Sequence, residues 1–181
     1  ETIPIKNFQQ YIDLYIGTKD ESKRVYEQSD ERWEYAVAMS PTHEFIQVSF
    51  VNGIWTYNGG THVDYIFKQI TDKLKALITK KKENKSLTIK PSQITEHLSI
   101  FISAVINDPA FSSQTKGELT SKVSNFGSTC IIDEVFIKKL SATGLTELVT
   151  EFAKECFSIT DKKIYCDDAW FNICYPGDYQ E

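Results

Sequence analysis

Residues 51–63 read VNGIWTYNGGTHV, and this stretch marks the change from strand-like to helical sequence. The run before it, residues 45–51, is apolar and typical of a strand. Gly59 and Gly60 then break the chain, because glycine adopts backbone conformations that other residues avoid. Thr61 is a good N-cap residue, so we expect it to cap a helix that begins immediately afterwards.

The clearest helix signal lies at residues 62–79, where apolar residues recur at the spacing of a single helix face. The same periodicity predicts a second helix at about 145–157, with a shorter apolar helix before it at 133–140. The apolar face of the first helix is formed by Val63, Ile66, Phe67, Ile70, Leu74, Leu77 and Ile78.

Alternation of apolar residues with a period of two predicts strands at 11–16, 33–39, 45–51 and 97–106. The sequence Ser-Pro-Thr at 40–42 is typical of a turn, so we expect the second and third of these strands to form a hairpin. Strands, a long helix, another strand and then helices indicate an α+β fold, with helices packed on one face of a small sheet.

The 181 residues are enough for one large domain, or for a domain with an appendage. Hydrophobic residues make up 41% and charged residues 25%, which argues against intrinsic disorder. No apolar run approaches the roughly 18 residues of a transmembrane helix. Because the sequence begins at Glu1 without an initiator Met or a signal sequence, we expect it to be part of a longer protein.

The net charge of −5 argues against a protein that coats nucleic acid, but the charge is unevenly distributed. Lys80, Lys81, Lys82 and Lys85 form a basic island just after the long helix. On composition alone this island is either a solvated loop or a contact to a polyanion, in which each lysine neutralises a phosphate. The segment after residue 160 is acidic and aromatic.

A second segment of chemical interest is Gln114-Thr115-Lys116, which follows the 97–106 strand after a polar loop. Gln and Thr can donate hydrogen bonds to phosphate oxygens, and Lys brings a compact positive charge. Taken alone, a loop lysine is usually only solvated. No G-x-x-x-x-G-K-[ST] or G-x-G-x-x-G loop occurs in the sequence, so another domain would have to hold any nucleotide that Lys116 contacts.

The remaining candidates do not form a self-sufficient active site. Cys130, Cys156, Cys166 and Cys174 include no C-x-x-C pair and have few histidines nearby. We therefore expect free thiols, buried or half-buried, and no zinc site. His62, directly after the Gly-Gly pair, is expected to form a hydrogen bond within that turn.

Three stretches, read together, resemble the transducer domain in the ATPase region of type IIA DNA topoisomerases of the eukaryotic type. Residues 51–63 look like the family signature V-N-x-x-x-T-x-x-G-G-x-H-V, and residues 114–116 are similar to its Q-T-K loop. Residues 125–130, NFGSTC, resemble its F-G-S-T-C stretch, and residues 32–34 match the start of a family hairpin. The likeness runs from about residue 10 to residue 153.

The resemblance implies a fold similar to domain 2 of ribosomal protein S5: a small, mostly antiparallel sheet with helices on one face and a left-handed crossover. It also implies a division of the chain. Residues 1–157 would form the transducer domain, and residues 158–181 an acidic, aromatic segment leading toward the DNA-cleavage core.

The resemblance further implies the transducer part of an ATP-hydrolysing DNA topoisomerase, an isomerase that passes one duplex through another. ATP and Mg²⁺ would be bound mainly by domains outside this sequence, which itself would provide no metal ligands. Gln114, Thr115 and Lys116 would bind the nucleotide, and Lys116 would act as the catalytic contact to the γ-phosphate. The chain would relay ATP binding and hydrolysis to the DNA gate, and by itself it would be inactive.

The implied partners are duplex DNA and a second copy in a homodimer, with no membrane. Lys80, Lys81 and Lys82 fall where the family carries a lysine-rich loop, and with Lys85 they would contact the DNA. The implied location is intracellular: the nucleus for a cellular enzyme, or the host cytoplasm or nucleus for a viral one.

Two alternatives stay open at the level of sequence. One is an S5-like nucleic-acid-binding module, which would use the basic island and have no need of the Q-T-K loop. The other is the middle domain of a related chaperone or mismatch-repair ATPase. Tyr57 and Asn58 at the variable positions of the signature, together with the short lysine loop, indicate a divergent member of the family, cellular or viral.

Overall fold

The computed structural model describes residues 4–42, 44–81, 84, 87–160, 164–167 and 170–173, with side chains up to residue 156. The regular elements follow one another in the order α1 (Phe8–Ile16), β1 (Arg24–Asp30), β2 (Trp33–Met39), β3 (Ile46–Val51), β4 (Ile54–Trp55), α2 (Thr61–Lys80), α3 (Pro91–Thr95), β5 (Leu98–Ala104), the short helix η2 (Val123–Asn125), α4 (Glu134–Leu140), the π-helical turn η3 (Ser141–Leu145), α5 (Thr146–Thr160), β6 (Ile164–Asp167) and β7 (Trp170–Ile173).

The main sheet has five strands in the order β1-β2-β5-β3-β4. The pairs β1–β2, β2–β5 and β3–β4 are antiparallel, and only β3–β5 is parallel. The expectation of a small, mostly antiparallel sheet in an α+β fold is therefore confirmed.

The predicted hairpin of residues 33–39 and 45–51 is wrong, because β5 lies between these two strands and pairs with both. The hairpin partner of β2 is instead β1, a strand that the sequence pattern missed. Strand β1 is an edge strand whose far half is exposed, so it lacks the alternating apolar residues by which the others are recognised. The strand predicted at 97–106 is confirmed as β5.

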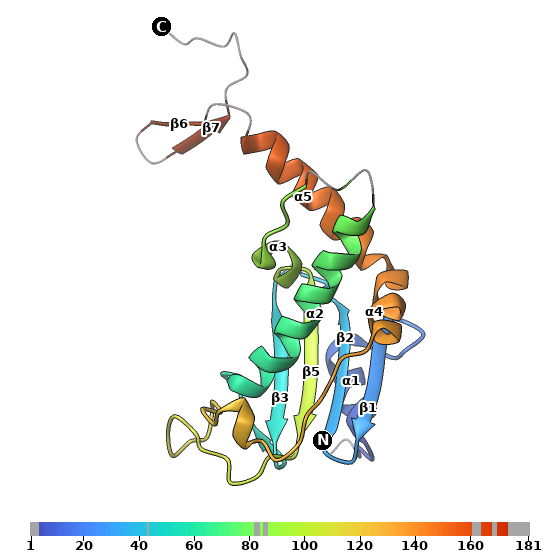
Figure 1. Ribbon diagram of the computed structural model, residues 1–181, viewed down its shortest axis with the longest axis vertical. Helices are drawn as coiled ribbons and strands as arrows, with labels where there is room; N and C mark the ends of the chain where they lie inside the picture. Colours follow the sequence, from blue (N-terminus) through green and yellow to red (C-terminus); the bar gives the residue numbers. More distant parts are fainter. Residues whose placement is uncertain are drawn as a thin grey trace, which may run out of the picture.

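The connection from β3 to β5 carries α2 across one face of the sheet, as Figure 1 shows. With both strands pointing down in that view and α2 in front, β5 lies to the right of β3, which makes the crossover left-handed. Parallel crossovers are right-handed in about 98% of cases. The left-handed connection expected from the family resemblance is therefore a distinctive feature of this fold.

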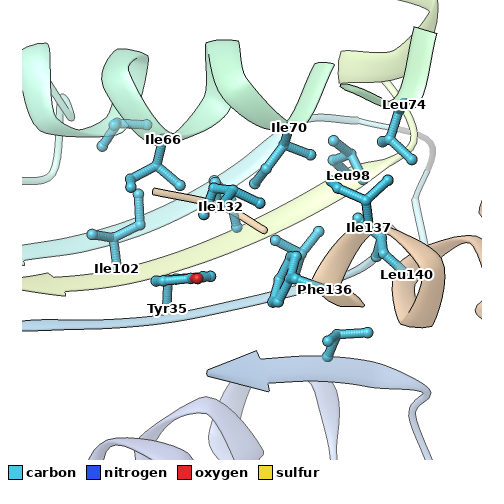
Figure 2. Close-up of a cluster of buried hydrophobic side chains, with 14 of the residues drawn as sticks. Tyr35, Ile66, Ile70, Leu74, Leu98, Ile102, Ile132, Phe136, Ile137 and Leu140 are labelled. Atoms are coloured by element: carbon cyan, nitrogen blue, oxygen red, sulfur yellow. The ribbon is translucent and has the colours of Figure 1, made fainter. Parts of the chain in front are cut away.

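The main core lies between the sheet and helices α2 and α4. Figure 2 shows Ile66 and Ile70 of α2 directed toward the sheet, with Ile102 of β5 below Ile66 and Phe136 of α4 beside Tyr35 of β2. The rings of Tyr35 and Phe136 meet edge to face, with 5.1 Å between their centroids. The helices predicted at 62–79, 133–140 and 145–157 are confirmed as α2, α4 and α5.

The strand predicted at residues 11–16 is wrong, because this segment belongs to helix α1. The Asn7 side chain accepts a hydrogen bond from the backbone N–H of Gln10 (2.9 Å), and Gly17 ends the helix with φ of 79°. Ile12 packs against Ala36 and Phe101, whose side chains leave β2 and β5 on the face opposite α2. Residues 8, 11, 12 and 16 form an apolar helix face. The sequence pattern did not reveal this face, because residues 11–16 also fit the period of two that is typical of a strand.

At the C-terminal end, β6 and β7 pair with each other and form a separate two-stranded sheet. The side chains of this segment, including Cys166 and Cys174, lie outside the described residues. The division at residues 157 and 158 falls within α5 and stays a prediction.

We predict that Phe136→Ala lowers the free energy of unfolding by about 3–5 kcal/mol, because it leaves a cavity beneath Tyr35. The measurement is urea unfolding of the 181-residue chain, followed by circular dichroism. Val135→Ala, on the exposed side of the same helix, is the control and should change stability by less than about 1 kcal/mol. Equal effects of the two substitutions would contradict the packing of α4.

Candidate functional site

The Q-T-K segment forms an exposed turn in the long connection between β5 and α4. The backbone N–H of Lys116 donates to the carbonyl of Ser113 (3.0 Å), and Lys116 adopts a left-handed conformation with φ of 56°. Gln114, Thr115 and Lys116 are all exposed. The Lys116 Nζ lies 6.0 Å from the centroid of the Phe111 ring. The turn thus presents a cation and an amide to solvent.

The turn is attached to the Gly-Gly pair by backbone hydrogen bonds. The N–H of Leu119 donates to the carbonyl of Gly59 (3.1 Å), and the N–H of Thr61 donates to the carbonyl of Leu119 (3.0 Å). A Cβ atom at Gly60, where φ is 123°, would lie 2.3 Å from the Leu119 oxygen. Only glycine therefore allows the two backbones to come this close.

Thr61 does not cap α2 as expected. The N-cap position is Gly60, which has no side chain, and Thr61 is the first helical residue. Its hydroxyl donates instead to the carbonyl of Ser121 (2.7 Å) and so holds the same connection against the start of the helix. From sequence alone, a threonine at the start of a helix can be either the N-cap residue or the first residue of the helix. The structure shows that Thr61 is the first residue.

Tyr57 forms a second contact between the signature and the turn. Its hydroxyl lies 3.1 Å from the Thr115 hydroxyl, which also lies 2.7 Å from the Ser113 hydroxyl. A Cβ atom at Gly117 would be 2.4 Å from the nearest atom of the Tyr57 ring. The adjacent N–H of Asn58 donates to the Gly117 carbonyl (2.8 Å).

His62 is fully buried at the base of this region. The Thr56 hydroxyl donates to the Ser49 carbonyl (2.9 Å), so we assign a proton to His62 Nε2, which lies 3.2 Å from Thr56 Oγ1 and donates to it. Burial lowers the pKa of His62 to about 4. The expected hydrogen bond within the turn is confirmed, and the imidazole is neutral at pH 7.

The F-G-S-T-C stretch has a structural role. Phe126 is fully buried, and Ser128 accepts a hydrogen bond from Trp33 Nε1 (2.8 Å). Arg32 donates to the carbonyls of Val105 and Gly127, both at 3.0 Å. These contacts hold the connection that follows β5 at both of its ends. The turn at Lys116 therefore lies between two anchored segments.

No described residues suggest metal or thiol chemistry here. Burial raises the pKa of the Cys130 thiol to about 12, which keeps it protonated, and Cys156 is half-buried. In the part of the chain with described side chains, no three His, Cys, Asp or Glu residues come together as metal ligands. Among the described helices, none combines the length and the apolar character needed to cross a membrane.

The basic island of Lys80, Lys81, Lys82 and Lys85, or lysine-rich segment, begins at the other end of α2. Lys80 is the last residue of the helix and is exposed, and Lys81 Nζ lies 3.5 Å from a carboxylate oxygen of Glu147. This exposed ion pair contributes little stability. Lys82 and Lys85 lie outside the described residues. Since α2 has 20 residues, its two ends are about 30 Å apart, and the structure does not bring Lys80 or Lys81 near Lys116.

Comparison with known proteins assigns this architecture to a family. The family model described as DNA gyrase B matches residues 7–164. The chain belongs to the DNA gyrase B family. The alternative of a middle domain from a chaperone or mismatch-repair ATPase is thereby set aside. The resemblance to type IIA topoisomerases is confirmed.

Relatives within this family are eukaryotic topoisomerases II. The chain is 43% identical over 157 residues to DNA topoisomerase 2 of Arabidopsis thaliana, an alignment that covers 83% of the chain and 10% of the relative. It is also 43% identical over 157 residues to a probable DNA topoisomerase 2 of Dictyostelium discoideum, with 85% and 10% covered. The chain thus spans about a tenth of the length of these curated relatives.

Solved structures of the same region are also similar. The ATPase and transducer domains of DNA topoisomerase II from Balamuthia mandrillaris match with a TM-score of 0.78 and 36% identity, over 85% of this chain and 38% of that one. The ATPase region of Saccharomyces cerevisiae topoisomerase II matches with a TM-score of 0.74 and 40% identity, over 84% and 38%. The chain therefore corresponds to part of the ATPase and transducer region of topoisomerase II.

Sequence reasoning located the Q-T-K turn but missed the residues that hold it. Gly117 and Tyr57 were not singled out for contact, because they are 60 positions apart and no local pattern joins them. A signal was nevertheless available. A glycine directly after a polar loop is typical of a tight turn.

We predict that Gly60→Ala destabilises the chain by more than about 3 kcal/mol, because the new methyl group would overlap the Leu119 backbone. Gly53→Ala is the matched control: its φ is also positive, at 76°, but no atom lies within 4 Å of the added Cβ. It should cost only the backbone strain, about 1–2 kcal/mol. Urea unfolding measures both, and equal losses would contradict the close approach.

We predict that neutral His62 makes stability dependent on pH. The pKa is about 4 in the folded chain and about 6.5 when unfolded, so the contribution is complete above pH 6.5 and is lost as the pH falls toward 4. The total loss is about 3 kcal/mol. Unfolding free energies measured between pH 7.5 and pH 4.5 should fall less steeply for His62→Gln. Identical slopes would contradict the buried, neutral imidazole.

Proposed function

We propose that this chain is the transducer of an ATP-dependent type II DNA topoisomerase and that Lys116 supplies a contact to the ATP γ-phosphate. One observation carries this proposal: Lys116 stands exposed on a turn that is fastened by backbone hydrogen bonds to the Gly-Gly pair. A solvated lysine needs no such attachment. A lysine that must reach a phosphate held by another domain needs this attachment, because its position has to be defined before the ligand arrives.

The residues of the turn fit a terminal phosphate. The Lys116 ammonium supplies charge-assisted hydrogen bonds, and the Gln114 amide is free to donate beside it. Thr115 is already held by two hydroxyl groups, so we assign it to shaping the turn as much as to binding. ATP and Mg²⁺ would be held by the nucleotide-binding domain of the whole enzyme. The contact ends once the γ-phosphate leaves, and this makes the turn sensitive to the nucleotide state.

Helix α2 offers a route from the turn to the DNA. His62, in the first turn of α2, is hydrogen-bonded to Thr56; the last turn carries Lys80, and Lys81 is the C-cap residue. Because a packed helix moves as a rigid element, a displacement at the Q-T-K end is carried about 30 Å to the lysine-rich segment. We assign contact with duplex DNA to that segment. In the homodimeric enzyme, this coupling would relay ATP binding and hydrolysis to the DNA gate, and the nucleus is the location that eukaryotic relatives suggest.

A simple nucleic-acid-binding module is the less favoured function. It would use Lys80 and Lys81, yet it gives no reason for the ordered turn at Lys116, at the opposite end of α2. ATP hydrolysis that depends on Lys116 separates the two functions.

In the full-length enzyme, Lys116→Ala should lower the kcat of ATP hydrolysis about a hundredfold, or by roughly 2.7 kcal/mol of transition-state stabilisation. Lys122→Ala, which removes another exposed lysine of the same connection, is the control and should leave kcat within about twofold. Unchanged unfolding temperatures would show that both variants fold. Undiminished hydrolysis by Lys116→Ala would overturn the proposed role of the turn.

Replacing Lys80, Lys81 and Lys82 together by alanine should weaken the stimulation of ATP hydrolysis by DNA. The physical reason is the loss of phosphate contacts, so the salt dependence of DNA binding should become shallower by about one unit of slope per lost contact. Lys68→Ala combined with Lys75→Ala, two exposed lysines earlier on α2, is the control. Basal hydrolysis without DNA should not change. A DNA stimulation equal to that of the control would contradict the assignment.

A further inference from the structure

The backbone of the Lys116 turn is strained and therefore needs support. A lysine with φ of 56° occupies the left-handed region, which costs about 1–2 kcal/mol for a residue with a Cβ. Such a conformation persists only where the surroundings determine it. The one backbone hydrogen bond inside the turn, from Lys116 to Ser113, joins two exposed residues and competes with water.

Backbone hydrogen bonds hold the base of the turn, from Ser112 N–H to the Glu118 carbonyl (3.0 Å) and from Asn58 N–H to the Gly117 carbonyl (2.8 Å). Tyr57 supports the tip of the turn through two further contacts. Its hydroxyl lies 3.1 Å from the Thr115 hydroxyl, on one side of Lys116. Its ring covers Gly117 on the other side, where an added Cβ would lie 2.4 and 2.6 Å from two ring carbons and 2.7 Å from the hydroxyl oxygen. Gly117 is accordingly buried although the five residues before it are exposed. The ring and hydroxyl of one side chain thus hold both neighbours of Lys116.

Tyr57 is itself well positioned to do this. Its carbonyl accepts a hydrogen bond from Gln47 Nε2 (2.8 Å), and the next residue, Asn58, donates to the Gly117 carbonyl (2.8 Å). The ring of Trp55 lies beside it, with 5.6 Å between centroids. Tyr57 nevertheless remains 46% exposed, which is more than a residue with only a packing role in the core would be.

From these contacts we propose that Tyr57 is a positioning residue, which holds the Q-T-K turn in the conformation that directs Lys116 outward. The proposal rests on the proposed function of Lys116 and adds the residue that regulates its availability. In this role Tyr57 does not need to touch ATP or the reacting atoms. Its effect is on the fraction of molecules in which the turn is formed, so it acts on kcat, whereas ATP is bound by other parts of the enzyme.

The kinetic test uses the full-length enzyme with Tyr57→Phe and Tyr57→Ala. Tyr57→Phe keeps the ring over Gly117 and loses only the hydroxyl contact, so kcat should fall about fivefold. Tyr57→Ala loses both contacts, and kcat should fall about tenfold or more, with KM for ATP changed less than twofold. Tyr26→Phe, which removes a tyrosine hydroxyl bonded to Glu34 far from the turn, is the control and should behave as the unmodified enzyme.

The same substitutions are then made together with Lys116→Ala. If Tyr57 acts through Lys116, Tyr57→Ala should have no further effect once the lysine is gone. An equal fall in both backgrounds would mean that Tyr57 acts by another route, and this would overturn the proposal. A large effect of Lys116→Ala with none from Tyr57→Ala would also overturn it, while leaving the function of Lys116 intact. No effect of Lys116→Ala would be a failure of the proposed function itself.

A second readout does not depend on ATP. Trypsin cleaves after lysine, and the bond between Lys116 and Gly117 lies under the Tyr57 ring. Cleavage at this bond, followed by mass spectrometry under native conditions, should be about tenfold faster in Tyr57→Ala. Cleavage after Lys122, in the same connection, is the internal reference and should not change. An unchanged rate at Lys116 would show that Tyr57 does not order the turn.

Discussion

The close approach of two backbones at Gly60 and Leu119 is the constraint on which the end of the molecule with the Q-T-K turn depends. The connection from β5 to α4 is long and contains little regular structure, so its backbone groups must find partners elsewhere. Hydrogen bonds to Gly59 and Thr61 provide them, but only because Gly60 has no Cβ. The Gly-Gly pair therefore does more than start a helix: it joins two segments that are distant in sequence.

That joint also explains the arrangement of the family motifs. Thr56 and His62 close a buried network beneath the Gly-Gly pair, and Arg32 and Phe126 anchor the far side of the connection. The motifs thus contribute to one base that carries the exposed Q-T-K turn. The helix that begins at this base ends at Lys80, so it could provide the link that the proposed function requires between the turn and the lysine-rich segment.

Sequence reasoning predicted the parts of the structure that depend on local patterns. Helices α2, α4 and α5 and strand β5 were predicted correctly because their apolar spacing is regular. Strand pairing was not, since the insertion of β5 between β2 and β3 depends on contacts between residues more than 50 positions apart. For the site, the motif singled out Lys116, whose role stays a prediction. The role proposed for Tyr57 could not be predicted from the sequence, because it depends on where the ring lies and not on its neighbours in sequence.

Lys116 is proposed to reach a phosphate that this chain does not itself hold. A structure of the full-length enzyme with a non-hydrolysable ATP analogue would test this contact. In that structure Lys116 Nζ should lie about 3 Å from an oxygen of the γ-phosphate, with the turn in the conformation described above. A Lys116 side chain that remains in solvent, more than about 6 Å from the nucleotide in the closed dimer, would contradict it.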